Sequence, residues 1–552
     1  MKSIRNIFIV GCAIVLTGCG GSTASDSSPQ LSSVTNVPSG SSTTKTRVTG
    51  TITYDRVPHA ADASLDYDRT ITQPVRGTVI EAVDAQGQVL ATTRTDEAGE
   101  YGFDIDVNTT VRVQVKAQLL SDGEQQKWDF KVTDNTQNNS LYVLQGSLVD
   151  TGQNARQVRD LHASHGWDGQ SYRDPRAAAP FAILDSVNLA VTAISAIDKT
   201  VEFPPLEIRW SPNNRTVIGQ RALGHIGTSS FVDSDDNVDA IYLLGEADRD
   251  TDEYDPHVIL HEWAHYFEHN LSRRDSLGGL HSLQDRLDAR VAFSEGWSNA
   301  FAGIVTGDPI YKDSSGMGQS KGFQFNLETL ESQNRGWYNE ASVSAVLYDI
   351  FDDAADAGDT VSGGLSAIYN VMRSDDYINA PVFATIFSVA DGLRKDMPEQ
   401  ETDLDNLLAL HGISGRGANG VGEKNAGAIR SALPVYKQAE VNGGSVNLCS
   451  VDDAGIHNKL GNREFIFLDL NVAQDVTLTL IKTSGDDRRD PDFNIWRGTE
   501  LLHKSATSRA GEEEFKGRFE SGHYIIEAFD FYNINGSGSR RGDSCYDFSV
   551  AG

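Results

Sequence analysis

Residues 259–266 read "ILHEWAHY" and place two histidines four residues apart, with a glutamate directly after the first. In an α-helix, residues four apart lie one above the other on the same face, so His261 and His265 point to a common place. Glu262 is rotated by about 100° from His261, which lets it stand beside that place without being directed at it. The spacing therefore predicts a helix with two metal ligands and a neighbouring general base.

Other interpretations of the same residues are two exposed histidines on a helix, or a structural zinc site. Structural sites fill all four positions with Cys and His, and no cysteine lies near this motif. A catalytic zinc keeps three protein ligands and one open position. The candidate for the third ligand is Glu295, which lies 30 residues after His265 in a second predicted helix, "VAFSEGWSNAFAGIV".

The two motifs together resemble the gluzincin metallopeptidases, especially the thermolysin and fungalysin types, and Glu295-Gly296-Trp297-Ser298 is similar to the fungalysin form. The resemblance implies an α+β peptidase domain that binds Zn²⁺ through His261, His265 and Glu295, with Glu262 as catalytic base. Those families carry Asp four residues after this Glu, where this chain has Asn299. An amide oxygen still accepts a hydrogen bond from an imidazole but lacks the charge that raises ligand basicity.

The resemblance also implies an oxyanion-stabilising His or Tyr later in the chain. The stretch "NRGWYNEASVSAVLYDIF" has no His, so Tyr338 is the predicted replacement, and Tyr348 and His281 are weaker candidates. The alternative for Tyr338 is a packing residue at the start of a helix. An edge strand that aligns the substrate is expected at residues 239–246. Glu268 and His269 are predicted to be surface residues because of their position around the helix.

Acidic residues flank the predicted edge strand. Asp248, Asp250 and Asp252 stand at alternate positions, a spacing that suits Ca²⁺, but the glycine of an EF-hand loop is missing. The alternatives are therefore a calcium site and a solvated acidic loop.

The chain opens with "MKSIRNIFIVGCAIVLTGCG", a short basic region followed by an apolar run too short to span a bilayer. Residues 16–19, "LTGC", resemble the bacterial lipobox. This resemblance implies a lipoprotein signal peptide over 1–18, lipidation of Cys19, and anchoring to the cell envelope, at the outer membrane or cell surface. The alternative is an ordinary signal peptide in which Cys19 occurs by chance. Residues 19–45 are rich in Ser, Thr and Gly and predict a flexible tether.

Three domains are predicted after the tether: residues 46–150, 155–435 and 436–552. In the first, alternating residues and turn signals predict a β-sandwich, and "TTRTDEAGEYGFDI" resembles carboxypeptidase-regulatory-like modules. In the second, the metallopeptidase domain, helices are expected at 180–197, 256–271, 290–306, 338–356 and 379–394. The third resembles the pre-peptidase C-terminal β-sandwich through its strands and "SGHYIIEAF". Cys449 and Cys545 both fall there, and export permits a disulfide between them, with two free thiols as the alternative.

The formal net charge of −31 argues against a nucleic-acid partner, because phosphate binding needs clustered Lys and Arg. The predicted activity is hydrolysis of protein or peptide substrates by an exported zinc metallopeptidase. An endopeptidase is favoured because no exopeptidase signature such as "GAMEN" occurs. The alternative is a surface binding or adhesion lipoprotein built on an inert peptidase fold, which the Asn299 departure and the missing His favour.

Overall fold

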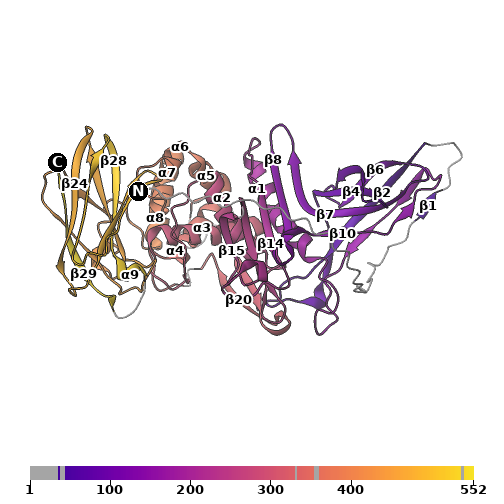
Figure 1. The fold of residues 1–552 in the computed structure, drawn as a ribbon, viewed down its shortest axis with the longest axis horizontal. Helices are drawn as coiled ribbons and strands as arrows, with labels where there is room; N and C mark the ends of the chain where they lie inside the picture. Colours follow the sequence, from indigo (N-terminus) through magenta and orange to yellow (C-terminus); the bar gives the residue numbers. More distant parts are fainter. Residues whose placement is uncertain (1–34, 38–43, 236, 330–331, 353–359, 536–539) are drawn as a thin grey trace, which may run out of the picture.

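The computed structural model describes residues 35–37, 44–235, 237–329, 332–352, 360–535 and 540–552. The predicted signal peptide, Cys19 and most of the predicted tether lie outside these residues. N-terminal strands, a central group of helices and a C-terminal group of strands follow one another along the long axis of the molecule (Figure 1). The fold is therefore multidomain and α+β.

The N-terminal strands form two sheets. The first contains β1 (Thr35–Val37), β12 (Arg156–Val158), β2 (Lys45–Arg56), β13 (Leu161–Ala163), β3 (Ile71–Pro74) and β6 (Glu100–Asp106). The second runs in the order β15 (Ser230–Asp235), β16 (Val238–Leu243), β14 (Leu206–Trp210), β8 (Lys127–Asp134), β7 (Thr110–Asp122), β4 (Thr78–Asp84) and β5 (Val89–Arg94), with β9 (Ser140–Leu141), β10 (Val143–Gln145) and β11 (Val149–Asp150) beside it.

The second sheet crosses the domain boundary that we predicted at residue 150. Strand β8 pairs in parallel with β14, so that Phe130 stands opposite Leu206. Both side chains are buried in the same core cluster, together with residues of the central helices. Residues 46–150 are thus joined to the central region by a shared sheet and a shared core. Alternating residues indicate strands, but they do not say which strands pair.

The edge strand of this sheet is β15, whereas we predicted the edge at residues 239–246. Those residues largely form β16, which is covered by β15 in antiparallel pairing, with Phe231 opposite Ile241. The short segment that becomes β15 has only one buried apolar residue, Phe231, and its apolar content alone did not distinguish it from a loop.

The helices of the central region are α1 (Ala179–Ile197), α2 (Pro256–Leu271), α3 (Ala289–Thr306), α4 (Glu340–Phe351), α5 (Gly364–Arg373), α6 (Asp375–Ile378), α7 (Ile386–Asp396) and α8 (Glu401–Leu410). The Asp288 side chain caps α3 by accepting from the Arg290 amide, and Gly307 ends the helix at a φ of 65°. Helix α7 begins later than the predicted residue 379, because Thr385 and Ser388 form a capping box there.

Helix α1 is long and apolar enough to cross a membrane by length and composition. Its residues Ile183, Val187 and Ala190 are fully buried in the main core. Packing against the sheet and α2 therefore accounts for its apolar character.

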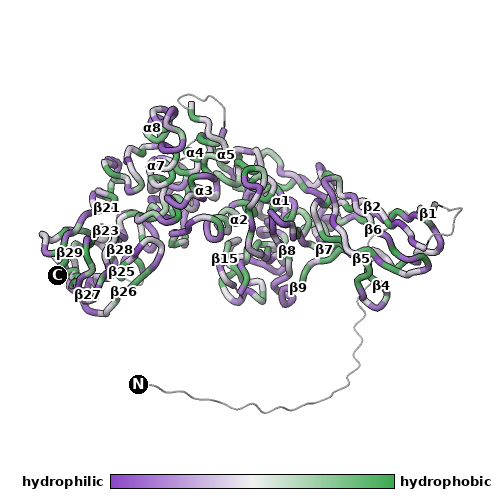
Figure 2. Tube along the Cα trace, turned by 90° about the horizontal axis from the view of Figure 1, so that it is seen from above, coloured by the Kyte–Doolittle hydropathy of each residue, from purple (hydrophilic) through white to green (hydrophobic). Residues whose placement is uncertain are grey.

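The C-terminal strands form two sheets around a separate core. The strand order of one sheet is β21 (Tyr436–Ala439), β23 (Arg463–Leu470), β28 (Gly522–Asp530), β25 (Pro491–Arg497) and β26 (Glu500–Ser505). The order of the other is β22 (Val446–Ser450), β29 (Ser544–Ala551), β24 (Gln474–Ser484) and β27 (Glu512–Phe519). Hydrophobic and hydrophilic residues are interspersed along these strands (Figure 2). In β24 they alternate, and the buried members are Val476, Leu478 and Leu480. Cys449 and Cys545 are joined by a disulfide, which suggests an exported protein.

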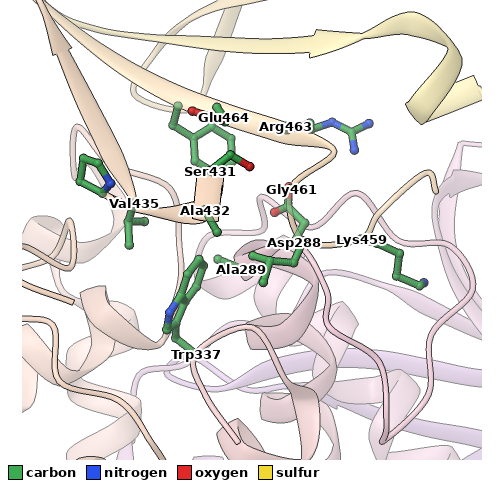
Figure 3. Close-up of a pocket in the computed structure, with 13 residues that line it drawn as sticks. Asp288, Ala289, Trp337, Ser431, Ala432, Val435, Lys459, Gly461, Arg463 and Glu464 are labelled. Carbon is green, nitrogen blue, oxygen red and sulfur yellow. The ribbon is translucent and has the colours of Figure 1, made fainter. Parts of the chain in front are cut away.

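The C-terminal strands contact the start of α3. A cavity of about 20 Å³ lies at this contact, between Trp337, Asp288 and Arg463 (Figure 3). That volume suits a single water molecule, so the cavity is a packing defect of the interface rather than a substrate site.

Candidate metal centre

Helix α2 carries His261 and His265 on one face, with ring centroids 4.9 Å apart. Helix α3 packs against α2 and brings Glu295 to the same place. Glu295 Oε2 lies 3.2 Å from His261 Nε2 and 3.4 Å from His265 Nε2. All three residues are buried, with exposed fractions of 8%, 6% and 5%. The structure thus brings together the three ligands predicted from the sequence.

The chemistry of this group fits a zinc ion. One donor atom from each residue lies within 4.8 Å of the others. Glu295 Oε2 is buried and has no well-aligned hydrogen-bond partner, although imidazole nitrogens surround it. Two imidazoles and one carboxylate are a ligand set of catalytic zinc sites. Such a cation would satisfy the oxygen that the protein leaves without a hydrogen bond.

The electrostatics of the cluster point the same way. Burial opposes a charge on His265, but Glu295 and then Glu268 outweigh it and raise the pKa of the imidazole to about 10. Burial also opposes ionisation of Glu295, yet the neighbouring histidines hold its pKa well below the usual range. The site therefore attracts positive charge, which a metal ion supplies in place of the protons.

The second nitrogen of each histidine has its own partner. His261 Nδ1 lies 2.9 Å from Asn299 Oδ1, the arrangement expected for the residue that replaces Asp. His265 Nδ1 lies 3.1 Å from Ser298 Oγ and 3.4 Å from Glu268 Oε2. These contacts orient both rings toward Glu295.

Our prediction that Glu268 is a surface residue is wrong, because it is only 1% exposed. It lies three residues after His265 on the same helix, close enough to reach the ring. Ser294 of α3 covers it and donates a hydrogen bond of 2.5 Å to its carboxylate. Asn299 gives His261 no negative charge, whereas the carboxylate of Glu268 supplies one beside His265. His269 is exposed, as expected.

A pocket of about 610 Å³ opens beside the cluster and is lined by His261, Glu262, Asn299 and His281, among others. Glu262 Oε2 accepts a 2.7 Å hydrogen bond from the Phe231 amide of β15. Glu262 therefore lies between the cluster and the edge strand, with its carboxylate held in place by the backbone.

Tyr338 takes a different position from the one we predicted for an oxyanion donor. Its hydroxyl donates to the Arg335 carbonyl at 2.9 Å and also lies 3.0 Å from Asn425 Oδ1. Neither Tyr338 nor Tyr348 is among the described residues that line the pocket. These contacts make Tyr338 part of the packing before α4.

His281 faces the cluster instead. Its Nε2 lies 3.3 Å from Glu295 Oε2, and its Nδ1 lies 2.7 Å from Glu340 Oε2 at the start of α4. Burial alone would lower the pKa of His281, but Glu340 and Glu295 raise it to about 9. His281 belongs to a loop without helical periodicity, so only its residue type could have suggested this role.

A second acidic group lines the same pocket. Asp250 and Asp252 lie beside Asp313, with one carboxylate oxygen of each within 4.8 Å of the others. Burial, followed by repulsion from Asp255 and Asp250, raises the pKa of Asp313 to about 8. Asp248, which we grouped with them, instead accepts a hydrogen bond from the Gly318 amide at 2.8 Å. Calcium binding here stays a prediction, with Asp313 in the place of Asp248.

Asp250 belongs to β18 (Asp250–Thr251) and Asp313 to β19 (Ile310–Ser315), in a small sheet with β17 (Gly245–Glu246) and β20 (Lys321–Asn326).

Comparison with known protein families gives a match, and it covers the region of the metal cluster. The profile of the mycolysin C-terminal domain matches residues 232–385, which contain the metal cluster and Glu262. No protein of curated function matches the chain.

Three solved structures are similar only weakly. The pre-peptidase C-terminal domain of collagenase from Bacillus anthracis is 11% identical over 21% of this chain and 93% of its own, with a TM-score of 0.16. PliG, a periplasmic inhibitor of g-type lysozyme from Aeromonas hydrophila, is 14% identical over 21% and 98%, with a TM-score of 0.14. A β-glucosidase from Paenibacillus barengoltzii is 10% identical over 94% and 69%, with a TM-score of 0.13. At these scores none of them bears on the function. The mycolysin match and the buried cluster of His261, His265 and Glu295 together fit a mycolysin-like zinc metallopeptidase.

Proposed function

We propose that the protein is a zinc-dependent peptidase that hydrolyses internal peptide bonds of proteins or peptides. One observation carries this proposal: His261, His265 and Glu295 form a buried cluster at the wall of an open pocket, with Glu262 beside them. A zinc ion held by these three residues would lower the pKa of a bound water and polarise the scissile carbonyl.

The residues of the chain supply the remaining chemistry. Glu262 takes a proton from the attacking water and passes it to the leaving amine. His281 donates a hydrogen bond from Nε2 to the carbonyl oxygen as that oxygen gains negative charge. Glu340 accepts from Nδ1 of His281 and keeps the ring directed into the pocket.

The edge strand β15 is the element along which we expect the substrate peptide to align. An extended peptide would pair with the backbone on the open side of β15, apart from the Phe231 amide, which is bonded to Glu262. The Phe231 amide of this strand already holds Glu262, so a peptide along β15 passes next to the base. Binding through the backbone suits an endopeptidase, because it does not require a free chain end. Export and lipid anchoring through Cys19 stay predictions.

Metal removal tests the proposal directly. Hydrolysis of casein by the full chain is expected to stop after treatment with a zinc chelator and to return when about one equivalent of Zn²⁺ is added back. Released peptides are measured together with bound zinc. Hydrolysis that continues in metal-free protein would contradict the proposal.

Replacing His281 by Ala is expected to lower kcat by roughly 10²- to 10³-fold, because an oxyanion donor is lost. Bound zinc and KM should change little, since His281 is not one of the proposed ligands. His523→Ala is a suitable control because His523 lies on the exposed side of β28, paired with Asp469. A loss of zinc equal to the loss of activity would instead make His281 part of the metal site.

A further inference from the structure

Two cavities meet at His281. One is the pocket of about 610 Å³ beside the metal cluster, and the other is a groove of about 720 Å³. His281 lines both of them. One wall of the groove is the loop between α2 and α3, and the other is the C-terminal β domain. Residues that line it include Leu277, Leu280, Asp285, Ile456, Lys459 and Ile534.

Hydrogen bonds between the two walls fix the shape of the groove. Asn458 Nδ2 donates to the Gly278 carbonyl at 2.7 Å, and Lys459 Nζ donates to the Leu280 carbonyl at 2.6 Å. Backbone bonds join Asp288 to Asn458 and Leu460 to Arg286, each at 2.9 Å. A groove with fixed walls is preorganised, so a ligand does not have to order it on binding.

Several of the side chains that line the groove are apolar. Leu280 is 89% exposed and Leu277 is 39% exposed, and Ile456 and Ile534 of the opposite wall are partly exposed. Lys459 Nζ lies 3.4 Å from Asp285, so these two charges offset each other. Neighbouring exposed apolar side chains in a groove are typical of binding sites.

We propose that this groove binds the part of the polypeptide substrate that continues from the scissile bond, with apolar side chains against Leu277 and Leu280. The inference rests on the proposed function, because a peptide that passes His281 enters the groove from the metal pocket. An extended chain advances about 3.3 Å per residue, so several residues beyond the scissile bond reach the C-terminal wall. The C-terminal β domain is therefore a part of the substrate site.

Substrate length tests this inference. Two fluorogenic peptides are compared: one of about ten residues with apolar residues on both sides of the cleaved bond, and one of only its central four or so. The variant is Leu280→Glu, which changes an exposed side chain. The control is Val472→Glu, because Val472 is 63% exposed on a turn of the same C-terminal domain away from the groove.

Leu280→Glu is expected to raise KM for the long peptide by roughly 5- to 20-fold, the equivalent of losing an apolar side chain that the peptide buries only in part. Its kcat and its KM for the short peptide should equal those of the wild type, and Val472→Glu should affect neither peptide. Equal effects on both peptides, or no effect on either, would contradict the proposal that the groove binds the substrate.

Binding separates this inference from the proposed activity. The labelled long peptide is titrated, by fluorescence anisotropy, into zinc-loaded Glu262→Gln protein with and without Leu280→Glu. Weaker binding to the double variant supports the groove even if the wild type hydrolyses neither peptide, a result that would overturn the peptidase assignment alone. Equal binding to both proteins would reject the groove as a substrate-binding site, whether or not the protein hydrolyses the peptides.

Discussion

Glu262→Gln is expected to lower kcat for casein or peptide hydrolysis by about 10³-fold while the protein still binds about one zinc ion. The amide keeps the size of the side chain and can still accept the hydrogen bond from Phe231, which is 2.7 Å long in the wild type. It cannot take a proton from water. The loss should therefore appear in kcat, with little change in KM.

The experiment compares three zinc-loaded proteins: wild type, Glu262→Gln and Glu399→Gln. Glu399 lies on an exposed turn before α8 and serves as the matched control for a Glu-to-Gln change. Initial rates are measured beside zinc content, so that a loss of metal is not mistaken for a loss of base. Equal rates in wild type and Glu262→Gln would mean a contaminating protease or a wrong base. No hydrolysis in any zinc-loaded protein would favour the inert binding protein.

The local part of the site could be predicted from the sequence because it depends on helix geometry alone. His261, Glu262 and His265 share one helix, and their relative directions follow from their spacing. The pairing of Glu295 and Asn299 with that helix came from resemblance to known peptidases, and the structure places both against it.

The rest of the site depends on contacts between distant segments, which spacing does not encode. His281 reaches Glu295 from a loop held by the C-terminal domain, and it lies 59 residues from its partner Glu340. Glu268 is an exception, because it lies seven residues after His261 and helix geometry already puts it on the metal-binding face. Our prediction of a surface residue overlooked this, and α3 packs over Glu268 and buries it. The same limit explains the edge strand: β15 is recognisable only from its pairing with β16.

The largest stability effect is expected at Arg290, in the first turn of α3. Its guanidinium donates to Asp288 at 2.9 Å and to Glu527 of β28 at 2.7 Å, and it stacks on Phe383 and Phe465. Arg290 and Glu527 are each only 1% exposed. Without Arg290, Asp288 loses this partner and Glu527 keeps only Arg463, 3.1 Å away, of its two cations. Breaking a buried pair in this way costs about 3–5 kcal/mol.

Arg290→Met keeps much of the apolar volume and should lower the melting temperature by roughly 10 °C, as measured by calorimetry. The control is Arg518→Met, because Arg518 and Asp475 form an exposed pair at 3.8 Å whose loss should cost at most about 1 kcal/mol. Arg290→Met together with Glu527→Met should recover part of the loss, since no acidic charge is then left at the position of Glu527. Equal shifts for the two single variants would show that the buried pair contributes no more than a surface one.

The same pair predicts how stability depends on acid. Burial alone would raise the pKa of Glu527, but Arg290 and Arg463 outweigh it and lower the pKa from 4.5 to about 2. A carboxylate with a lowered folded-state pKa stabilises the protein above its unfolded pKa, and this contribution is lost as pH falls toward the folded value. The wild type should therefore lose melting temperature between pH 4.5 and about 2, more steeply than Arg290→Met does. Because α3 also carries Glu295, this charged contact links the docking of the C-terminal domain to the helix that completes the metal centre. Identical pH profiles for the two proteins would show that Arg290 does not contribute to the lowered pKa of Glu527.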